Sequence, residues 1–177
     1  MSERTKRLPG LSGAFFEVGE PEDHALGRSR GGFGTKINLL VDGNGLPLAV
    51  SLKPGEAHEI NSLESLLESV KITQPRGAPK RHPDALAGDK GYSAAWVRNY
   101  LASYGIEDVI PTKDNEERNP GFDKEKYRMR NIVERAIGWL KQSRRIAMRF
   151  EKLATRFLGM IHLEIIMTYL GELPDTT

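Results

Sequence analysis

Hydrophobic and polar residues alternate most regularly between Thr35 and Leu52. Residues 35–41 alternate with a period of two, and residues 47–52 do so again, as expected for half-buried strands. The four residues between them, Asp-Gly-Asn-Gly at 42–45, supply the positive φ angles that hairpin turns need. We therefore expect a β-hairpin in which Asp42 has a turn role rather than a catalytic one.

Four later segments carry apolar residues at helical spacing. The first follows Asn61-x-x-Glu64, which is typical of a capping box. The second is expected to be capped by Ser93, and the others span 127–141 and about 153–170. The residues expected to face inward are Leu63, Leu66, Leu67, Val70, Trp96, Val97, Tyr100, Leu101, Tyr104, Val133, Ala136, Ile137, Leu140, Phe157, Ile161, Ile165 and Tyr169.

Two short apolar runs, 85–87 and 106–110, predict further strands. The order of strands and helices then favours an α/β fold with a mixed sheet flanked by helices. The first run ends in Gly88-Asp89, so a buried strand would deliver this carboxylate to its carboxyl-terminal tip, where ligands bind in α/β sheets. The residues alone favour a turn or cap role for Asp89 over a ligand-binding role.

The domain organisation follows from the same pattern. Residues 1–24 lack a helical period and predict a flexible arm, with one short strand at 14–18. Residues 25–172 form one core, and 173–177 form a tail. A basic, Gly-rich stretch, 26–34, is either a turn into a strand or a loop whose Arg28 and Arg30 touch phosphates. No internal repeat or long linker divides the chain.

Composition narrows the class of protein. The 177 residues include no cysteine, which excludes disulfides and thiolate metal sites and is typical of the reducing cytoplasm. We expect no signal peptide and no membrane span. The four histidines show no paired metal-ligand spacing.

Charge is unevenly distributed along the chain. Residues 124–156 contain 11 Lys or Arg and three Asp or Glu, a net charge of +8. Since the whole chain carries +2, the remainder carries −6. This asymmetry favours a polyanionic partner such as DNA, with Arg144, Arg145 and Arg149 as candidate contacts.

The basic segment includes a helix face with one carboxylate among cations. At about 100° per residue, Tyr127, Arg130, Glu134 and Lys141 fall within an arc of roughly 60°. Such a carboxylate suits a metal ligand that meets a polyanion. A solvated helix face with ordinary ion pairs is the alternative.

The spacing Tyr127-x2-Arg130-x3-Glu134-x6-Lys141 resembles the signature of insertion-sequence transposases with an Asp-Asp-Glu (DDE) triad, the IS-four/IS-five superfamily. LGRSRGGFGTKINLLVDGNGLPL at 26–48 and GDKGYS at 88–93 resemble the IS-five-like branch in the same order. The resemblance covers residues 19–171.

This resemblance implies an RNase H-like fold and metal-dependent strand cleavage and 3′-OH transfer at the inverted-repeat ends of an element. Asp89 and Glu134 would be the second and third acidic residues of a site for two Mg²⁺ or Mn²⁺ ions. Tyr127, Arg130 and Lys141 would hold phosphates or the transposon end.

The sequence departs from the family at the first acidic residue. No Asp of the expected kind precedes residue 26, and Glu17 is the one carboxylate in a strand-like run there. We therefore expect an RNase H-like sheet that lacks its usual first strand, and a chain that works in an oligomer with, or fused to, an upstream-frame product. The alternatives are a non-catalytic DNA-binding fragment and a more general RNase H-like nuclease.

Overall fold

The computed structural model describes residues 24–29, 31–73, 76–116, 119 and 121–171. Several expectations therefore lie outside the described residues: most of the arm at 1–24 with its strand at 14–18, the carboxylate of Glu17, the side chain of Arg30, and the tail at 173–177. None of the helices in the described part of the chain is long and apolar enough to cross a membrane.

Strands and helices interleave along the chain, which confirms the mixed α/β class. The elements are β1 (Gly27–Ser29), β2 (Gly32–Val41), β3 (Pro47–Pro54), α1 (Leu63–Ser69), β4 (Ala85–Ala87), α2 (Ala95–Ser103), β5 (Glu107–Val109), α3 (Lys124–Arg128), α4 (Asn131–Leu140), α5 (Arg144–Met148) and α6 (Ala154–Gly171), with short 3₁₀ turns at Glu59–Ser62 and Lys90–Tyr92.

The predicted hairpin is present as β2 and β3. The strands pair antiparallel, from Thr35 opposite Pro54 to Leu40 opposite Ala49. The Asp42 carboxylate accepts hydrogen bonds from the backbone N–H groups of Asn44 and Leu46, both at 2.9 Å, so its turn role is confirmed. The Gly-rich stretch contains β1, which pairs antiparallel with β2. This pairing involves only the first three residues of β2, Gly32 to Gly34.

The strands do not form the single mixed sheet that the sequence predicted. Among the described residues, β1, β2 and β3 form one antiparallel sheet, and β4 and β5 form a separate parallel pair. The expectation of one continuous sheet was wrong for this part of the chain, because no described strand joins β2 to β4.

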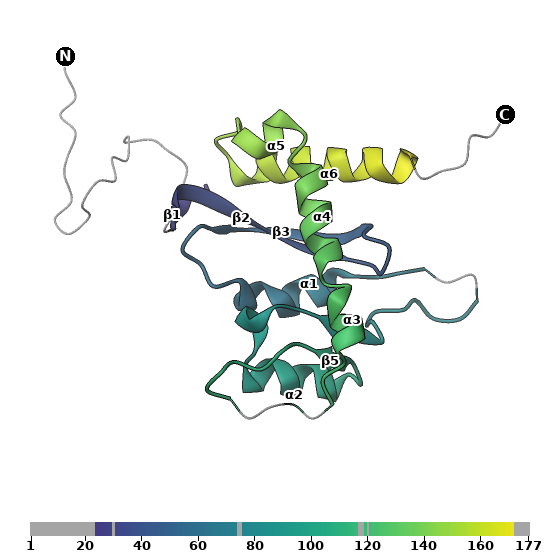
Figure 1. Ribbon diagram of the computed structural model, residues 1–177. Coiled ribbons are helices and arrows are strands. Elements are labelled where there is room, and N and C mark those ends of the chain that lie inside the picture. Colours follow the sequence, from purple (N-terminus) through teal and green to yellow (C-terminus); the bar gives the residue numbers. More distant parts are fainter. Residues whose placement is uncertain (1–23, 30, 74–75, 117–118, 120, 172–177) are drawn as a thin grey trace, which may run out of the picture.

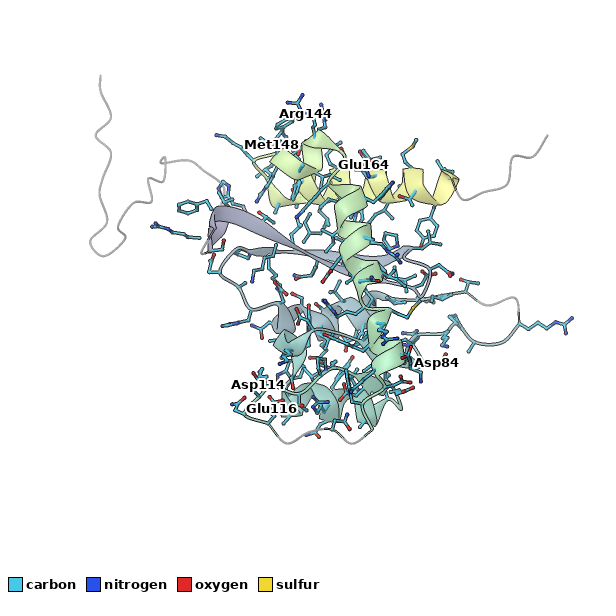
Figure 2. The ribbon with its side chains drawn as sticks, viewed as in Figure 1. Asp84, Asp114, Glu116, Arg144, Met148 and Glu164 are labelled. Carbon is cyan, nitrogen blue, oxygen red and sulfur yellow. The ribbon has the colours of Figure 1, made fainter. Side chains whose placement is uncertain are left out.

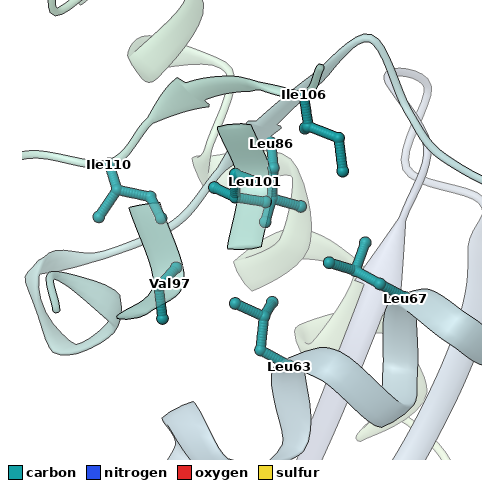
Figure 3. Packing of buried hydrophobic residues seen from close by; sticks show 7 residues of the cluster. All are labelled: Leu63, Leu67, Leu86, Val97, Leu101, Ile106 and Ile110. Carbon is teal, nitrogen blue, oxygen red and sulfur yellow. The ribbon is translucent and has the colours of Figure 1, made fainter. Parts of the chain in front are cut away.

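One apolar core lies between α1, α2 and the β4–β5 pair. Figure 3 shows its side chains converging from these elements. Leu67, Val97, Leu101 and Ile110 are completely buried. The core residues are Leu63, Leu67, Leu86, Val97, Leu101, Ile106 and Ile110.

A second core lies on the other face of the β2–β3 hairpin. Leu140, Ile146, Phe157 and Ile161 pack there against strand residues that include Ile37 and Leu39. In Figure 1, α5 and α6 lie on one side of β2 and β3, and α1 lies on the other, while α4 runs across the hairpin. The hairpin is therefore covered on both faces, whereas its alternating sequence predicted strands buried on one face only.

The beginnings of two helices differ from the prediction. Helix α1 begins after Ser62, which makes no side-chain cap, so the capping box at Asn61 is wrong. Ser62 is buried and binds the Asn38 amide instead. Helix α2 begins after Ala94 rather than Ser93. Ser93 is buried too, and its hydroxyl bonds Glu116 and Arg98.

The inward face of α2 is also narrower than predicted. Val97 and Leu101 are fully buried, whereas Trp96 and Tyr104 are 43% and 48% exposed. On α6, Phe157 and Ile161 are buried as predicted, whereas Tyr169 is 40% exposed and its hydroxyl donates to the Pro47 carbonyl at 2.8 Å.

The predicted single helix at 127–141 is interrupted. Helix α3 ends at Arg128 and α4 begins at Asn131. Between them, backbone bonds reach three residues back rather than four, as from Arg130 N–H to the Tyr127 carbonyl at 3.0 Å and from Val133 N–H to the Arg130 carbonyl at 3.2 Å. These tighter turns belong to a 3₁₀ joint, so the four signature residues do not share one helix face.

Candidate active site and DNA-contacting residues

The candidate site is a cavity of about 710 Å³ between the two sheets. Its walls come from β2, α1, β4 and α4, together with the loop at 80–84. Asp89 and Glu134, 45 residues apart in sequence, both line it, as does Arg130. The fold thus brings these three predicted site residues to one cavity.

Asp89 reaches the cavity from the end of β4. Its position two residues beyond the strand follows from the predicted run Ala85–Ala87, which is the strand in the structure. The Asp89 Oδ1 atom accepts a hydrogen bond from the Gly91 N–H at 2.8 Å and caps the following 3₁₀ turn. The cap role and the cavity position therefore coexist, and one carboxylate oxygen carries the cap bond.

Glu134 comes from the first turn of α4. Its side chain is 59% exposed and forms an ion pair with Arg130 at 2.8 Å. The Arg130 guanidinium also lies over the Tyr127 ring, 5.7 Å from its centroid. These three signature residues are in contact across the α3–α4 joint, although the helix is not continuous there.

Tyr92 is a further ionisable group at the cavity wall. Burial, and then the negative charges of Glu59 and Asp89, raise the pKa of Tyr92 to about 12. The phenol therefore stays protonated at neutral pH and can donate a hydrogen bond but not act as a base.

The other predicted DNA contacts are outside this cavity. Lys141 is exposed at the end of α4, and Arg28 is exposed on β1. Arg144 and Arg145 are exposed on α5. Figure 2 shows Arg144 at the edge of the molecule opposite to that of Asp114 and Glu116. None of these four residues lines the cavity that Asp89 and Glu134 share.

Arg149 has a structural environment that the sequence did not indicate. Its guanidinium donates to the carbonyls of Ala25 at 3.3 Å and Lys152 at 3.1 Å, and also to the His24 carbonyl and the Thr35 hydroxyl. It also lies 5.1 Å from the centroid of the Phe157 ring. The guanidinium is thus used within the protein, and we leave Arg149 out of the proposed DNA surface.

Sequence reasoning missed one wall of the cavity, formed by Lys80, Arg81 and His82. The backbone N–H and C=O of Lys80 pair with those of Ile72, which holds this basic stretch against the segment that follows α1. The only signal was the basic composition of the loop at 73–83, and composition does not show where a loop lies.

The acidic residues of the cavity fit a divalent metal only in part. Carboxylate oxygens are the ligands that Mg²⁺ prefers, and Asp89 and Glu134 provide them. Yet the part of the chain that the structure describes has no cluster of three His, Cys, Asp or Glu residues able to hold a metal ion. A third acidic ligand for the metal would have to come from residues outside the described part of the chain or from another polypeptide.

Comparisons with known proteins identify the family. A family model described as a transposase DDE domain matches residues 14–170. A protein of Burkholderia cepacia, named as a transposase for insertion sequence element IS402, is 34% identical over 122 residues, which cover 68% of this chain and 56% of the relative.

A second relative, from Brucella ovis, is named as a transposase for insertion sequence element IS6501. It is 32% identical over 138 residues, which cover 77% of this chain and 98% of the relative. No solved structure matches the chain. The family model covers most of the chain, and the motifs that suggested the resemblance lie within the matched residues. The chain therefore belongs to the transposase DDE-domain family.

Proposed function

We propose that this chain is the catalytic-core portion of an IS-five-like DDE transposase. Joined to an upstream polypeptide, it cleaves DNA at the inverted-repeat ends of an insertion sequence and transfers the 3′-OH strand to target DNA. The observation that carries the proposal is the shared cavity of Asp89 and Glu134. Membership of the family and the names of the two relatives support the same reaction.

Asp89 and Glu134 would hold the divalent cations, Mg²⁺ or Mn²⁺, that we expect in the complete enzyme. Bound divalent cations supply the positive charge that stabilises the attacking and leaving oxygens of strand cleavage. Each carboxylate has an oxygen that is not used in the bonds described above. One further acidic ligand would be supplied by the RNase H-like strand that we infer to be missing from the described residues.

Arg130 would position both Glu134 and the DNA. A guanidinium carries five N–H donors, and the ion pair with Glu134 joins Nη2 to Oε1. Donors therefore remain for a phosphate oxygen once DNA enters. Tyr127, under the guanidinium, restricts the orientation of Arg130 and has a hydroxyl that can bind the same phosphate.

The exposed basic residues Lys141, Arg144 and Arg145 would bind the DNA backbone further from the scissile phosphate. Exposed guanidinium and ammonium groups attract phosphates without reading the sequence. Arg28, exposed on β1, and Arg30, two positions later in the sequence, are the second group of candidate phosphate contacts.

A second candidate function is a non-catalytic DNA-binding fragment that occupies transposon ends. It is favoured by the absence of a three-residue acidic cluster from the described part of the chain. The nucleotide sequence upstream of the gene separates the two. An overlapping frame that encodes an Asp-bearing strand, with a slippery run at the junction, supports the enzyme, whereas a clean promoter and start site support the fragment.

Cleavage of labelled DNA ends tests the proposed enzyme. Alone, the 177-residue chain should cleave little or not at all with Mg²⁺, because two carboxylates leave the cation mostly hydrated and the nucleophile poorly positioned. Joined to its upstream polypeptide it should cleave, and Asp89→Asn or Glu134→Gln should abolish that cleavage.

The matched control is Glu125→Gln, an exposed residue of α3 that pairs with Arg128 at 2.9 Å and lies outside the cavity. It should retain cleavage. Efficient cleavage by the chain alone would show that another residue, Glu17 first, completes the site, and the need for an upstream polypeptide would be wrong.

A further inference from the structure

Helix α6, which lies at one edge of the molecule (Figure 1), has a second apolar face besides the one that packs against the hairpin. Four large side chains of this second face are more than half exposed: Leu163 (54%), Ile166 (52%), Met167 (63%) and Leu170 (54%). They are spaced by one, three or four residues, so they lie on one side of the helix. The helix is therefore apolar on two sides and covered on one.

This exposed face forms a stripe along the length of α6. At about 100° per residue, its seven residues fall within an arc of roughly 120°, and only one of them is charged. A helix that is apolar on all sides is normally buried, and an exposed apolar patch of several hundred Å² marks an interaction site. The residues of this α6 stripe are Arg156, Gly159, Met160, Leu163, Ile166, Met167 and Leu170.

The α6 stripe is complementary to a second copy of itself in the antiparallel direction. A twofold axis at Leu163 sets the Leu163 side chains of the two copies against each other, and every other contact then occurs twice. Met167 of one copy lies opposite Gly159 of the other, so a large residue faces a small one, as in close-packed cores. Ile166 lies opposite Met160. The stripe thus meets only apolar residues or glycine over its central part.

Charge at the two ends of the stripe favours the same direction. Arg156 is exposed in the first turn of α6. The last turn of a helix carries partial negative charge, and Glu172 follows this turn in the sequence. An antiparallel pair brings Arg156 of one copy opposite Leu170 in the last turn of the other. A parallel pair would instead set the two Arg156 side chains against each other.

The borders of the stripe favour a protein partner over a lipid surface. A helix that lies in a membrane interface is typically rich in Lys and Arg beside its apolar face. The α6 stripe is bordered by His162 on one side and Glu164 on the other. These borders supply no row of cations for anionic lipid.

We propose that α6 is a dimerisation helix, whose stripe packs antiparallel against the α6 stripe of a second copy of this chain. The two stripes would be in contact over about 27 Å, the length of an 18-residue helix. Such an interface is at the small end for protein complexes, so the dimer should dissociate with a constant on the order of 10 μM. No residue of α6 lines the cavity of Asp89 and Glu134, so pairing leaves that cavity accessible.

Sedimentation velocity of the full chain, at concentrations below and above the expected dissociation constant, tests the pairing. The sedimentation coefficient should rise from that of a monomer to that of a dimer. Leu163→Glu places two carboxylates face to face at the twofold axis and should weaken association at least about tenfold, and Met167→Glu should weaken it too. The matched control is Phe33→Glu, at a residue outside α6 that is 55% exposed, and it should associate like the natural chain. Circular dichroism checks that the variants are folded.

Disulfide formation tests the direction, since the natural chain has no cysteine. Leu163→Cys should link readily to a second copy of itself, because the axis brings the two positions within reach of a disulfide. Leu170→Cys should link to Arg156→Cys when the two proteins are mixed, but not to itself. Phe33→Cys gives the rate of linking by random collision. Efficient self-linking of Leu170→Cys would overturn the antiparallel direction.

A monomer at every concentration would overturn the proposal. So would a dimer that is as strong in Leu163→Glu and Met167→Glu as in the natural chain, because another surface would then hold it. Binding to anionic lipid vesicles that Leu163→Glu abolishes, without self-association, would assign the stripe to a membrane surface instead. If joining the upstream polypeptide prevented self-linking of Leu163→Cys, that polypeptide would be the occupant. These measurements use neither DNA nor Mg²⁺, so their failure is distinct from a failure to cleave DNA.

Discussion

At the scale of single residues, Arg149 shows how a cation can be used for the fold. It is in the left-handed region with φ 45°, and Ala25, whose carbonyl it binds, has φ 43°. A left-handed conformation costs a residue other than Gly about 1–2 kcal/mol. The bonds between the two residues and the contact with Phe157 offset this cost.

Replacing Arg149 should therefore destabilise the protein. Hydrogen bonds to a charged group contribute about 1.5–3 kcal/mol, so Arg149→Ala should lower the free energy of unfolding by about 3 kcal/mol in urea denaturation. Arg149→Lys keeps the charge but loses the planar fork, and should recover only part of the loss. If Arg149→Ala left stability unchanged and only weakened DNA binding, Arg149 would be a DNA contact after all.

Tyr92 should make stability depend on alkaline pH. The pKa of Tyr92 is raised to about 12 in the folded protein, against about 10 in an unfolded chain. The folded state thus keeps a proton that the unfolded state loses, so this stabilisation is complete below pH 10 and is lost as pH rises toward 12.

The measurement is the free energy of unfolding of the natural chain and of Tyr92→Phe between pH 9 and 12. The natural chain should lose more stability over this interval, because Phe cannot ionise. Parallel curves for the two proteins would contradict the assignment.

At the scale of elements, α5 and the α3–α4 joint carry different parts of the proposed DNA contact. The joint brings Tyr127, Arg130 and Glu134 together, and the last two line the cavity. Helix α5 carries Arg144 and Arg145, and Figure 2 shows Arg144 at a distant edge of the molecule. Contacts at the joint should affect cleavage, and contacts on α5 should affect affinity.

Arg144→Ala with Arg145→Ala should weaken DNA binding in a salt-dependent way. Each phosphate contact that is lost should flatten the slope of log K against log salt by about one unit, because fewer counterions are released. Affinity measured across salt concentrations checks this. The matched control is the double variant Lys124→Ala, Arg128→Ala, which removes the same amount of positive charge from α3. An unchanged slope in the α5 variant would exclude α5 as a DNA-binding element.

At the scale of the whole molecule, the described chain consists of two sheets with a cavity between their edges. The two carboxylates of the candidate site approach this cavity from different sides, Asp89 from β4 and Glu134 from α4. Their relative position depends on whatever joins the sheets, so metal binding and completion of the fold should be coupled.

Mg²⁺ should therefore stabilise the chain alone very little. With a dissociation constant near 10 mM, 10 mM Mg²⁺ would add only about 0.4 kcal/mol. The melting temperature, measured with and without Mg²⁺ at constant ionic strength, should shift by less than the shift in the joined protein. A large shift that Asp89→Asn abolishes would show that the chain forms a complete metal site without a partner.

The sequence by itself determined the features that depend on local chemistry. The alternation through β2 and β3, the turn at Asp42, the short run of β4 and the packing face of α6 were all predicted, because each depends on residues near one another in the chain. The pairing of Asp89 with Glu134 came from the family's motif spacing rather than from local pattern. The structure places both residues at one cavity.

Only the tertiary structure decided the features that depend on distant partners. Ser93 is buried against Glu116 and Arg98 instead of capping α2, and α1 begins after Ser62, which binds Asn38, rather than at the predicted cap Asn61. Arg149 binds residues more than a hundred positions away. The interruption of the helix before α4 and the separation of β2 from β4 also could not be predicted from local sequence. Hydrophobic periodicity indicates which side of an element is buried. It does not indicate which distant group covers that side, or which strand edge has no hydrogen-bonded neighbour.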